Sequence, residues 1–388
     1  MSRRILFVVD SLFPLGDAYQ LRILAEGLAL QHDVCICVTG STDPRDSSGL
    51  APPDVAIHFL SWDQKLKHRA AAAQVQVALR LRKRVRAFEP DIVHAFGQRA
   101  TSIAAATLMA MKARPETKLV SSVLSSWLPQ TASVQCFEGF LIKRVDHFLV
   151  AHPSLQKDLI DLDIATDNIS ILSNSVNKGT ARDGETEVAD QQRQQRRASL
   201  IEVTGIEPTA FIAVTSADLE PMTRLKDLIW ATDLLSCVRD DVHLVILGAG
   251  SQQKRLRMFA ECTEASPHVH FAGRPSTALE MLGASDVYWN SHLRTPLPSS
   301  LMAAMNFGVP VISVYGPQTE QLIRHQETGF AVNFGARDEF ARWTKFLIEK
   351  PDAAKQLAWQ GQQHVRREFE SEGAISDVEK IYEVELGR

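Results

Sequence analysis

Residues 243–250 carry the sequence HLVILGAG, which decides the fold of the region around it. The apolar run from His243 to Leu247 predicts a buried strand. Gly248 and Gly250 then predict a tight turn with a close approach of the backbone, and residues 252–265 predict a helix. The glycine pattern alone is a weak motif, but between a strand and a helix it indicates one unit of a parallel α/β sheet.

The same alternation continues on both sides of this unit. Toward the N-terminus, strands are predicted at residues 5–9, 34–38, 55–60, 91–94, 118–123, 147–151 and 169–172, and helices at 18–30, 70–88 and 101–112. In the other half, strands are predicted at 211–214, 269–271, 287–290 and 309–314, and helices at 225–238, 300–307, 320–324, 339–349, 353–369 and 373–386. Strands that alternate with helices favour parallel sheets covered by helices on both faces.

The alternation breaks at residues 178–198, which are rich in Gln, Arg, Asp and Glu and contain few apolar side chains. We interpret this segment as a linker, while its Gln/Arg part also fits the start of a helix that runs to Val203. The sequence therefore predicts a first domain over residues 1–177, a linker over 178–198 and a second domain over 199–368.

Composition and charge restrict the function classes. The chain has 388 residues, 45% of them hydrophobic, which is enough for two domains with separate cores. Its 42 basic and 46 acidic side chains give a net charge of -4, which does not support nucleic-acid binding.

The five cysteines are odd in number, and we expect structural thiols in a reducing compartment and no metal site. The first apolar run ends at Asp10, too early for a signal peptide, and no apolar stretch approaches the roughly 20 residues of a membrane span. We expect a cytoplasmic protein that at most lies on a membrane surface.

Several further segments occur in an informative order. They are residues 5–13 with Gly16, LAEGL at 24–28, PDIVH at 90–94, VDHFLV at 145–150, NSVN at 174–177, LGAG at 247–250, VHFAG at 269–273 and AMNFGVPV at 304–311. Their order and spacing resemble a GT-B glycosyltransferase of family 4 over nearly the whole chain. The segment at 304–311 resembles one of the most diagnostic stretches of that family.

The resemblance implies a fold, an activity and an arrangement of ligands. The fold would be α/β, with two Rossmann-like domains facing across a cleft and a C-terminal helix at 369–388 that packs back on the first domain. The activity would be transfer of a hexose from a nucleoside diphosphate sugar, with retention, to an unknown glycan, lipid or small-molecule acceptor. The donor would lie on the second domain and the acceptor on the first, with no cofactor other than the donor substrate.

The cations that should face the diphosphate are missing from their family positions. Negative charge grows on the leaving phosphate, so positive groups are needed there. The family's Arg and Lys align with Asp218 and Thr223. Arg224 either replaces the missing cation as a catalytic residue or belongs to a solvated helix start.

The two glutamates of the family, which contact the sugar and the ribose, align with Thr295 and Ala303. Pro296 and Pro298 between them have no N–H group to offer a phosphate. Ser299, Ser300 and Leu301 follow at the start of a helix. These residues either bind an anion at the positive helix end, or the serines only cap the helix.

The remaining candidate site residues rest on the same resemblance. Gly16, Gly248 and Gly250 would approach the donor through their backbones, while Asp17, beside Gly16, either repels a diphosphate or caps the helix from Ala18. Arg274 would contact the nucleotide base or its surroundings. Glu320 would contact the donor sugar or diphosphate and is a catalytic candidate. His94 is expected to be structural.

Two questions stay open from the sequence. The helix at 70–88 carries Arg80, Arg82, Lys83, Arg84 and Arg86, and is either a half-buried helix with a solvated basic face or a peripheral membrane contact. The loss of charged motif residues at 218, 223, 295 and 303 leaves either an active transferase with an altered donor site or a catalytically silent GT-B partner protein. A nucleotide-sugar epimerase of the same fold fits the matched segments less well.

Overall fold

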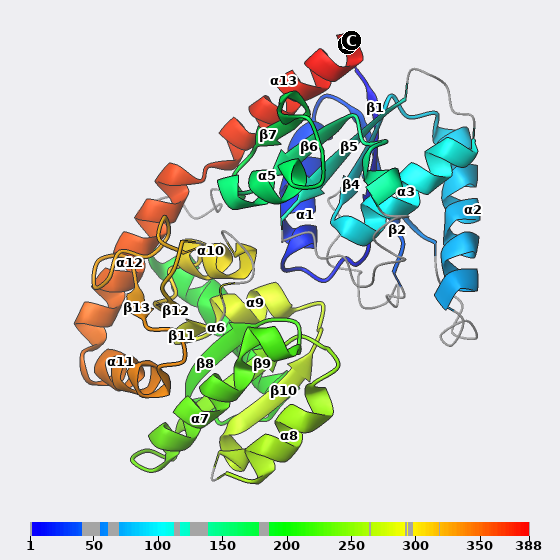
Figure 1. The fold of residues 1–388 in the computed structure, drawn as a ribbon. Helices are drawn as coiled ribbons and strands as arrows, with labels where there is room; N and C mark the ends of the chain where they lie inside the picture. Colours follow the sequence, from blue (N-terminus) through cyan, green and yellow to red (C-terminus); the bar gives the residue numbers. More distant parts are fainter. Residues whose placement is uncertain are drawn as a thin grey trace. The chain divides into compact units, whose positions relative to one another are not determined.

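The computed structural model describes residues 2–40, 55–60, 70–111, 117–124, 139–177, 186–263, 265–291, 293, 298–317 and 319–387. The chain divides into two compact units, which we call the first and second domains (Figure 1). The first domain is formed by Met1–Ser175 together with Ser371–Arg388, and the second by Val176–Glu370. The described part of the expected linker is helical from residue 186 onward.

The first domain is built on a parallel sheet that has seven strands in the described residues. They are β1 (Arg4–Val9), β2 (Asp33–Val38), β3 (Ala56–Phe59), β4 (Ile92–Phe96), β5 (Lys118–Val123), β6 (His147–Val150) and β7 (Ile169–Ile171). Their order is β3-β2-β1-β4-β5-β6-β7, so the chain reverses direction across the sheet between β1 and β4. In such Rossmann-like sheets, ligands bind beyond the carboxyl ends of the strands at this switch point.

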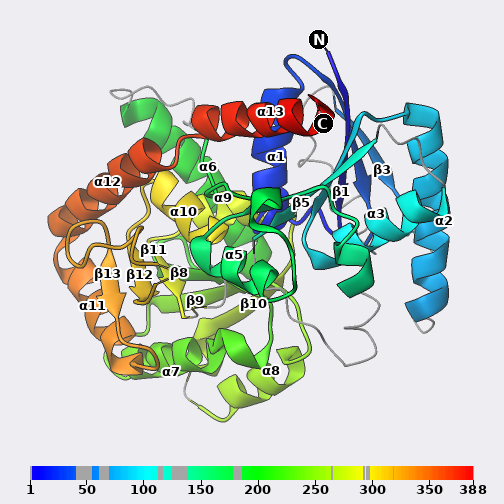
Figure 2. The same cartoon turned by 45° about the horizontal axis from the view of Figure 1, so that its top comes forward.

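Helices cover both faces of the first sheet. They are α1 (Asp17–Leu28), α2 (Ala70–Phe88), α3 (Gln98–Ala110), α5 (Pro153–Ile160) and α13 (Ser371–Gly387). Helix α13 packs on α1, while α2 packs on α3 (Figure 2). Because strand β1 is buried from Ile5 to Val9, its side chains on both faces are covered, as expected of a parallel sheet.

Two close contacts hold α13 against this domain. A Cβ atom at Gly27 of α1 would lie 2.2 Å from Cδ1 of Ile375, so the Ile375 side chain packs directly over this glycine. Tyr382 and Val378 of α13 are fully buried. The last helix of the chain is therefore part of the first domain's core, although it follows the whole second domain in sequence.

The second domain repeats the pattern with a parallel sheet of six strands in the described residues. They are β8 (Phe211–Ser216), β9 (Val242–Leu247), β10 (Val269–Gly273), β11 (Val287–Asn290), β12 (Val311–Val314) and β13 (Phe330–Val332). The order β10-β9-β8-β11-β12-β13 places the switch point between β8 and β11. Strand β13 was not predicted, and residues 320–324, predicted to be a helix, form turns instead.

The helices of the second domain are α6 (Thr186–Thr204), α7 (Leu225–Ser236), α8 (Gln253–Glu261), α9 (Ala278–Gly283), α10 (Ser299–Asn306), α11 (Arg337–Glu349) and α12 (Pro351–Glu368). Helix α7 packs on α8 and α11, while α9 packs on α6 and α10 (Figure 1). Few of the described side chains of helix α6 are buried, and most of its exposed residues are polar. This is why its composition resembles that of a linker. Arg197 anchors it through a 2.7 Å ion pair with Asp286.

Candidate functional site

The loops that follow β8, β9 and β10 form one connected surface at the carboxyl edge of the second sheet. The Gly248 N–H donates to the Gly273 carbonyl at 2.6 Å, and the Leu219 N–H donates to the Ala249 carbonyl at 3.1 Å. These backbone bonds bring together Gly248, Gly250 and the position before Arg274. The sequence predicted these residues to lie at one site, and the structure places them on neighbouring loops.

Gly248 and Gly250 are required by the packing of the protein itself. Gly248 has a φ of 141°, and a Cβ atom there would lie 1.9 Å from the Ala217 carbonyl oxygen. A Cβ atom at Gly250 would lie 2.6 Å from the Leu219 carbonyl oxygen. The close backbone approach predicted at both glycines is therefore made by the loop after β8.

Arg274 and Asp218 face each other across this surface. Nη2 of Arg274 donates to Oδ1 of Asp218 at 2.6 Å, and the two side chains are 41% and 65% exposed. Asp218 occupies the position where the family resemblance placed a cation. The charge of Arg274 is thus partly balanced by a carboxylate that solvent reaches easily.

Arg224 is held by a second, less exposed carboxylate. It adopts a left-handed backbone conformation with φ 53° at the start of α7, and its Nε donates to Asp227 at 2.5 Å. Arg337 donates to the other oxygen of the same carboxylate at 3.0 Å, and the Arg224 guanidinium lies 4.6 Å from the centre of the Phe334 ring. These partners fix Arg224 beside α11.

At the switch point between β8 and β11, the loops are held together by hydrogen bonds from side-chain hydroxyl groups to backbone carbonyls. Thr223 is buried, its hydroxyl donates to the Glu220 carbonyl at 2.7 Å, and its own carbonyl accepts from Ser291 at 2.7 Å. The position aligned with the family's Lys is thus part of a packed loop rather than a free side chain.

Helix α10 begins at Ser299, whereas the sequence predicted Ser299 and Ser300 to be caps that precede the helix. Its N-cap is Pro298, with no side-chain capping bond, and Ser299 is its first residue. The expectation that Ser299 and Ser300 cap the helix is therefore wrong. The Ser300 side chain is instead hydrogen-bonded to Tyr288, while Leu301 and Ala303 are buried in the core.

Glu320 lies after β12, in the loop two strands away from β8. Its N–H donates to the Gly316 carbonyl at 3.0 Å, and its side chain is exposed. Thr295 and Pro296, which the sequence also singled out, lie outside the described residues.

The first domain presents a smaller polar cluster at its own switch point. Gly16 has a φ of 67° and is the N-cap of α1, so the helix begins at Asp17 without the side-chain cap that the sequence suggested. A Cβ atom at Gly97, the N-cap of α3, would lie 2.8 Å from Oδ2 of Asp17. The Asp17 carboxylate therefore lies at the first turn of α3.

His94 lies inside the first domain and has a structural role. Its Nδ1 is 2.6 Å from the Tyr382 hydroxyl and its Nε2 is 2.8 Å from the Ser122 hydroxyl. Burial lowers the pKa of His94 to about 3, so the ring is neutral at physiological pH. This arrangement agrees with the expectation from the sequence.

Two protein-family models match the chain. Residues 16–175 match the model described as glycosyl transferase 4-like domain, and residues 196–364 match the model described as glycosyl transferases group 1. The chain belongs to the GT-B glycosyltransferases.

Individual relatives match only part of this glycosyltransferase, at about 30% sequence identity. It is 30% identical over 189 residues to EpsD of Bacillus subtilis (strain 168), which is named as a glycosyltransferase, with 49% of each chain covered. It is 29% identical over 137 residues to LpsE of Rhizobium meliloti (strain 1021), a lipopolysaccharide core biosynthesis glycosyltransferase, with 35% of this chain and 40% of LpsE covered. The matched segments thus span about half or less of these relatives.

Solved structures agree over the full length. HepE of Anabaena in complex with UDP-glucose has a TM-score of 0.73 at 17% identity, covering 98% of this chain and 100% of HepE. Sucrose-phosphate synthase of Thermosynechococcus elongatus has a TM-score of 0.70 at 14% identity, with 98% of both chains covered. These likenesses establish the GT-B fold.

Within the described residues of this GT-B protein, no group of three or more His, Cys, Asp or Glu side chains is placed to hold a metal ion. The helices of that same part of the chain are all too short or too polar to cross a bilayer.

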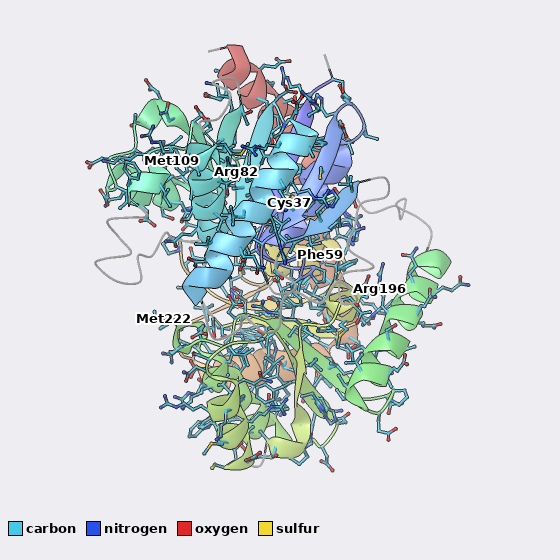
Figure 3. All side chains as sticks on the ribbon, turned by 90° about the vertical axis from the view of Figure 1, so that its right-hand side faces the viewer. Cys37, Phe59, Arg82, Met109, Arg196 and Met222 are labelled. Carbon is cyan, nitrogen blue, oxygen red and sulfur yellow. The ribbon has the colours of Figure 1, made fainter. Side chains whose placement is uncertain are left out.

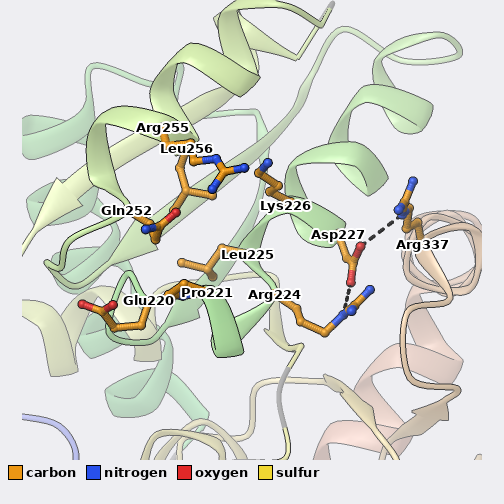
Figure 4. Close-up of a pocket in the computed structure, with 10 residues that line it drawn as sticks. All are labelled: Glu220, Pro221, Arg224, Leu225, Lys226, Asp227, Gln252, Arg255, Leu256 and Arg337. Carbon is orange, nitrogen blue, oxygen red and sulfur yellow. Dashed lines mark hydrogen bonds and ion pairs between the residues drawn. The ribbon is translucent and has the colours of Figure 1, made fainter. Parts of the chain in front are cut away.

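Sequence reasoning missed the cations that gather at the first turns of α7 and α8. A cavity of about 280 Å³ there is lined by Lys226 and Arg255, together with Arg224 and Arg337 (Figure 4). Of these cations, the sequence singled out only Arg224. Arg255 and Arg337 lie 29 and 111 residues further along the chain from Lys226, so no local motif joins them.

Proposed function

We propose that this GT-B protein transfers a hexose from a nucleoside diphosphate sugar to an acceptor, with retention of the anomeric configuration. The observation that supports the proposal most is the connected edge formed by the loops after β8, β9 and β10. There Gly248, Gly250 and Arg274 share one surface at the carboxyl edge of the second sheet, and the loop after β8 joins this surface to the switch point, where ligands of such sheets bind. HepE, which has the same fold, was solved with UDP-glucose, and this favours a UDP-sugar as the donor.

The chemistry requires positive charge near the leaving diphosphate, and Arg274 is the best placed cation. Its partner Asp218 is largely exposed, and exposed ion pairs contribute only about 0–1 kcal/mol. A diphosphate can therefore replace the Asp218 carboxylate at little cost. Glu320 would complete the donor site from the loop after β12, while Ser299, Ser300 and Leu301 would contribute N–H groups from the first turn of α10.

Binding should be tested before turnover. Calorimetric titration of the purified protein with UDP, UDP-glucose and GDP-mannose is expected to give saturable binding of one of them, which Arg274→Gln weakens about five-fold. Lys254→Gln, which removes an exposed cation from α8, serves as the control. Release of the nucleotide and the anomeric configuration of the product, read by proton NMR with a panel of acceptors, then test transfer and retention. Absence of binding to every nucleotide sugar would sink the proposal.

A second candidate function is a catalytically silent GT-B protein that acts as a partner of another enzyme. The pairing of both predicted cations with carboxylates, Arg274 with Asp218 and Arg224 with Asp227, favours it. Loss of a single preorganised donor costs about 10²–10³ in rate, so several losses leave little activity. Nucleotide binding without any turnover would support this candidate, and turnover of any nucleotide sugar excludes it.

We further propose a cytoplasmic protein whose first domain contacts anionic membranes through α2. The helix buries Val77, Leu81 and Val85 and exposes Val75 and Leu79. Lys83, Arg84 and Arg86 are exposed on the same helix, on which Figure 3 labels Arg82. Exposed apolar and basic side chains on one helix are typical of peripheral membrane contacts.

The membrane contact is testable by sedimentation with vesicles. Vesicles containing phosphatidylserine are expected to bind the protein, and Leu79→Ser together with Lys83→Gln should lower the bound fraction several-fold because they remove one apolar and one charge contact. Vesicles of phosphatidylcholine alone are the control. Equal binding of both vesicle types, or of both protein forms, contradicts the contact.

A further inference from the structure

The cavity between the first turns of α7 and α8 is distinct in position from the candidate donor surface. Its lining consists of Glu220, Pro221, Arg224, Leu225, Lys226, Asp227, Gln252, Arg255, Leu256 and Arg337. The residues assigned to the donor surface, such as Gly248, Gly250 and Arg274, are not among them. The loop with the buried Thr223 leads directly into the start of α7, where the cavity begins.

The charges of this cavity do not cancel. Four lining side chains are cationic and two are carboxylates, which leaves a net charge of +2 (4 minus 2). Both carboxylates are already engaged. Asp227 accepts from Arg224 and Arg337, and Glu220 accepts from the N–H and hydroxyl of Ser251 at 3.0 and 2.7 Å.

The excess charge is carried by Lys226 and Arg255. Figure 4 shows their head groups pointing toward one another at the cavity. The described part of the chain places no carboxylate within ion-pair distance of either group, and the one contact recorded for the Lys226 ammonium is the Phe259 ring, 5.0 Å away. Two cations that converge without a counter-ion repel each other, and an anion placed between them removes that repulsion.

We propose that this cavity is a second binding site, separate from the donor surface, for a small molecule that carries a phosphoryl group. Lys226 and Arg255 would hold the phosphoryl oxygens from two sides. Gln252 offers a neutral polar group, while Pro221, Leu225 and Leu256 offer an apolar wall for the rest of the molecule. A cavity of about 280 Å³ has room for a compact phosphate ester or a diphosphate. The proposal does not depend on glycosyl transfer.

The experiment is calorimetric titration of the full chain with sodium pyrophosphate at low salt, repeated with inorganic phosphate. Wild type is expected to bind pyrophosphate, and the double variant Lys226→Gln with Arg255→Gln should weaken binding about thirty-fold, since each lost charge contributes about five-fold. The control is Lys254→Gln with Arg257→Gln, which removes the same total charge from helix α8 at two positions outside the cavity lining. Thermal unfolding without ligand verifies that all variants fold. Each single variant, Lys226→Gln or Arg255→Gln, should weaken pyrophosphate binding about five-fold.

Three outcomes overturn the proposal. One is no binding of pyrophosphate to wild type up to about 10 mM, a limit that corresponds to negligible affinity. Another is equal weakening by the cavity variant and the control variant, which indicates a general charge effect. The third is binding that Arg274→Gln abolishes and the cavity variant leaves unchanged, because the anion then occupies the donor surface. Simultaneous binding of UDP and pyrophosphate supports two separate sites.

Discussion

At the scale of single residues, the two arginines predicted to lie in the donor site, Arg224 beside the diphosphate and Arg274 near the base, each contact a carboxylate, but the two pairs differ in burial. Asp218 is 65% exposed beside Arg274, whereas Asp227 is 7% exposed between Arg224 and Arg337. Water and ligands can compete for the first pair, because charges in high dielectric interact weakly. The second pair is shielded and bridged on both sides. The proposed donor site therefore relies on Arg274, and we expect a mainly structural contribution from Arg224.

The first prediction concerns Asp218→Asn. Removal of this carboxylate should tighten UDP binding about five-fold, because a unit charge about 4 Å from a phosphate costs about 1 kcal/mol in water. The free energy of unfolding should change by less than about 1 kcal/mol. Calorimetric titration with UDP measures the first effect and urea unfolding the second.

Asp241→Asn is the matched control for this variant. Asp241 forms an ion pair of the same 2.6 Å length with Arg239, and its side chain is also exposed. It is expected to leave UDP affinity unchanged. Weaker UDP binding by Asp218→Asn would show that Asp218 accepts a hydrogen bond from the ligand rather than repelling it.

The second prediction concerns Gly248→Ala. The added methyl group would lie 1.9 Å from the Ala217 carbonyl oxygen on a backbone with φ 141°. Strain and overpacking together should cost on the order of 3–5 kcal/mol. Gly205→Ala is the comparison, because Gly205 has a φ of 70° and open space around its Cα atom, and it should cost about 1 kcal/mol. Urea unfolding that gives equal losses for both variants would contradict the packing argument.

At the scale of elements, the strands were predictable and several site contacts were not. An apolar run such as Ile5–Val9 has a local signature, and the structure has a buried strand there. Strand β13 was not predicted, although β7, which is equally short, was. The Arg337–Asp227 contact joins residues 110 apart in sequence and depends on the packing of α11 on α7. Asp218 opposite Arg274 likewise follows from strand order rather than from spacing.

The third prediction concerns helix α13 and its anchor. Tyr382→Phe removes the hydroxyl that lies 2.6 Å from His94 and leaves a buried ring nitrogen without that partner. We expect a loss of about 1–3 kcal/mol in the free energy of unfolding, the cost of an unsatisfied buried polar group. Tyr315→Phe is the control, because Tyr315 is 53% exposed and should change stability little. Denaturant unfolding compares the two, and a loss in Tyr315→Phe as large as in Tyr382→Phe would reject the role of the buried bond.

At the scale of the whole molecule, each domain contains a histidine whose pKa is lowered mainly by burial, complete for His94 and partial for His270. His94 of the first domain is brought to about 3, and His270 of the second domain, which lies 3.0 Å from His243, to about 4. Both rings are neutral at neutral pH. The two Rossmann-like domains therefore share a sensitivity to acid, although their cores are built from different parts of the chain.

The fourth prediction follows from the sign of these shifts. The pKa of His94 is 6.5 in the unfolded chain and about 3 in the folded protein. Between these two pH values the unfolded chain binds a proton at His94 and the folded protein does not. Stability is therefore present in full above the unfolded pKa and falls as the pH drops. The contribution of His94 should approach about 1.4 kcal/mol per pH unit between about pH 6 and pH 4.

The variant His94→Gln removes this contribution, so its unfolding free energy should depend less steeply on pH than that of wild type. His325→Gln, which changes an exposed ring, should retain the wild-type slope. Urea unfolding over this pH range decides the question, and parallel curves for wild type and His94→Gln would mean that His94 is not the group that makes the first domain acid-sensitive.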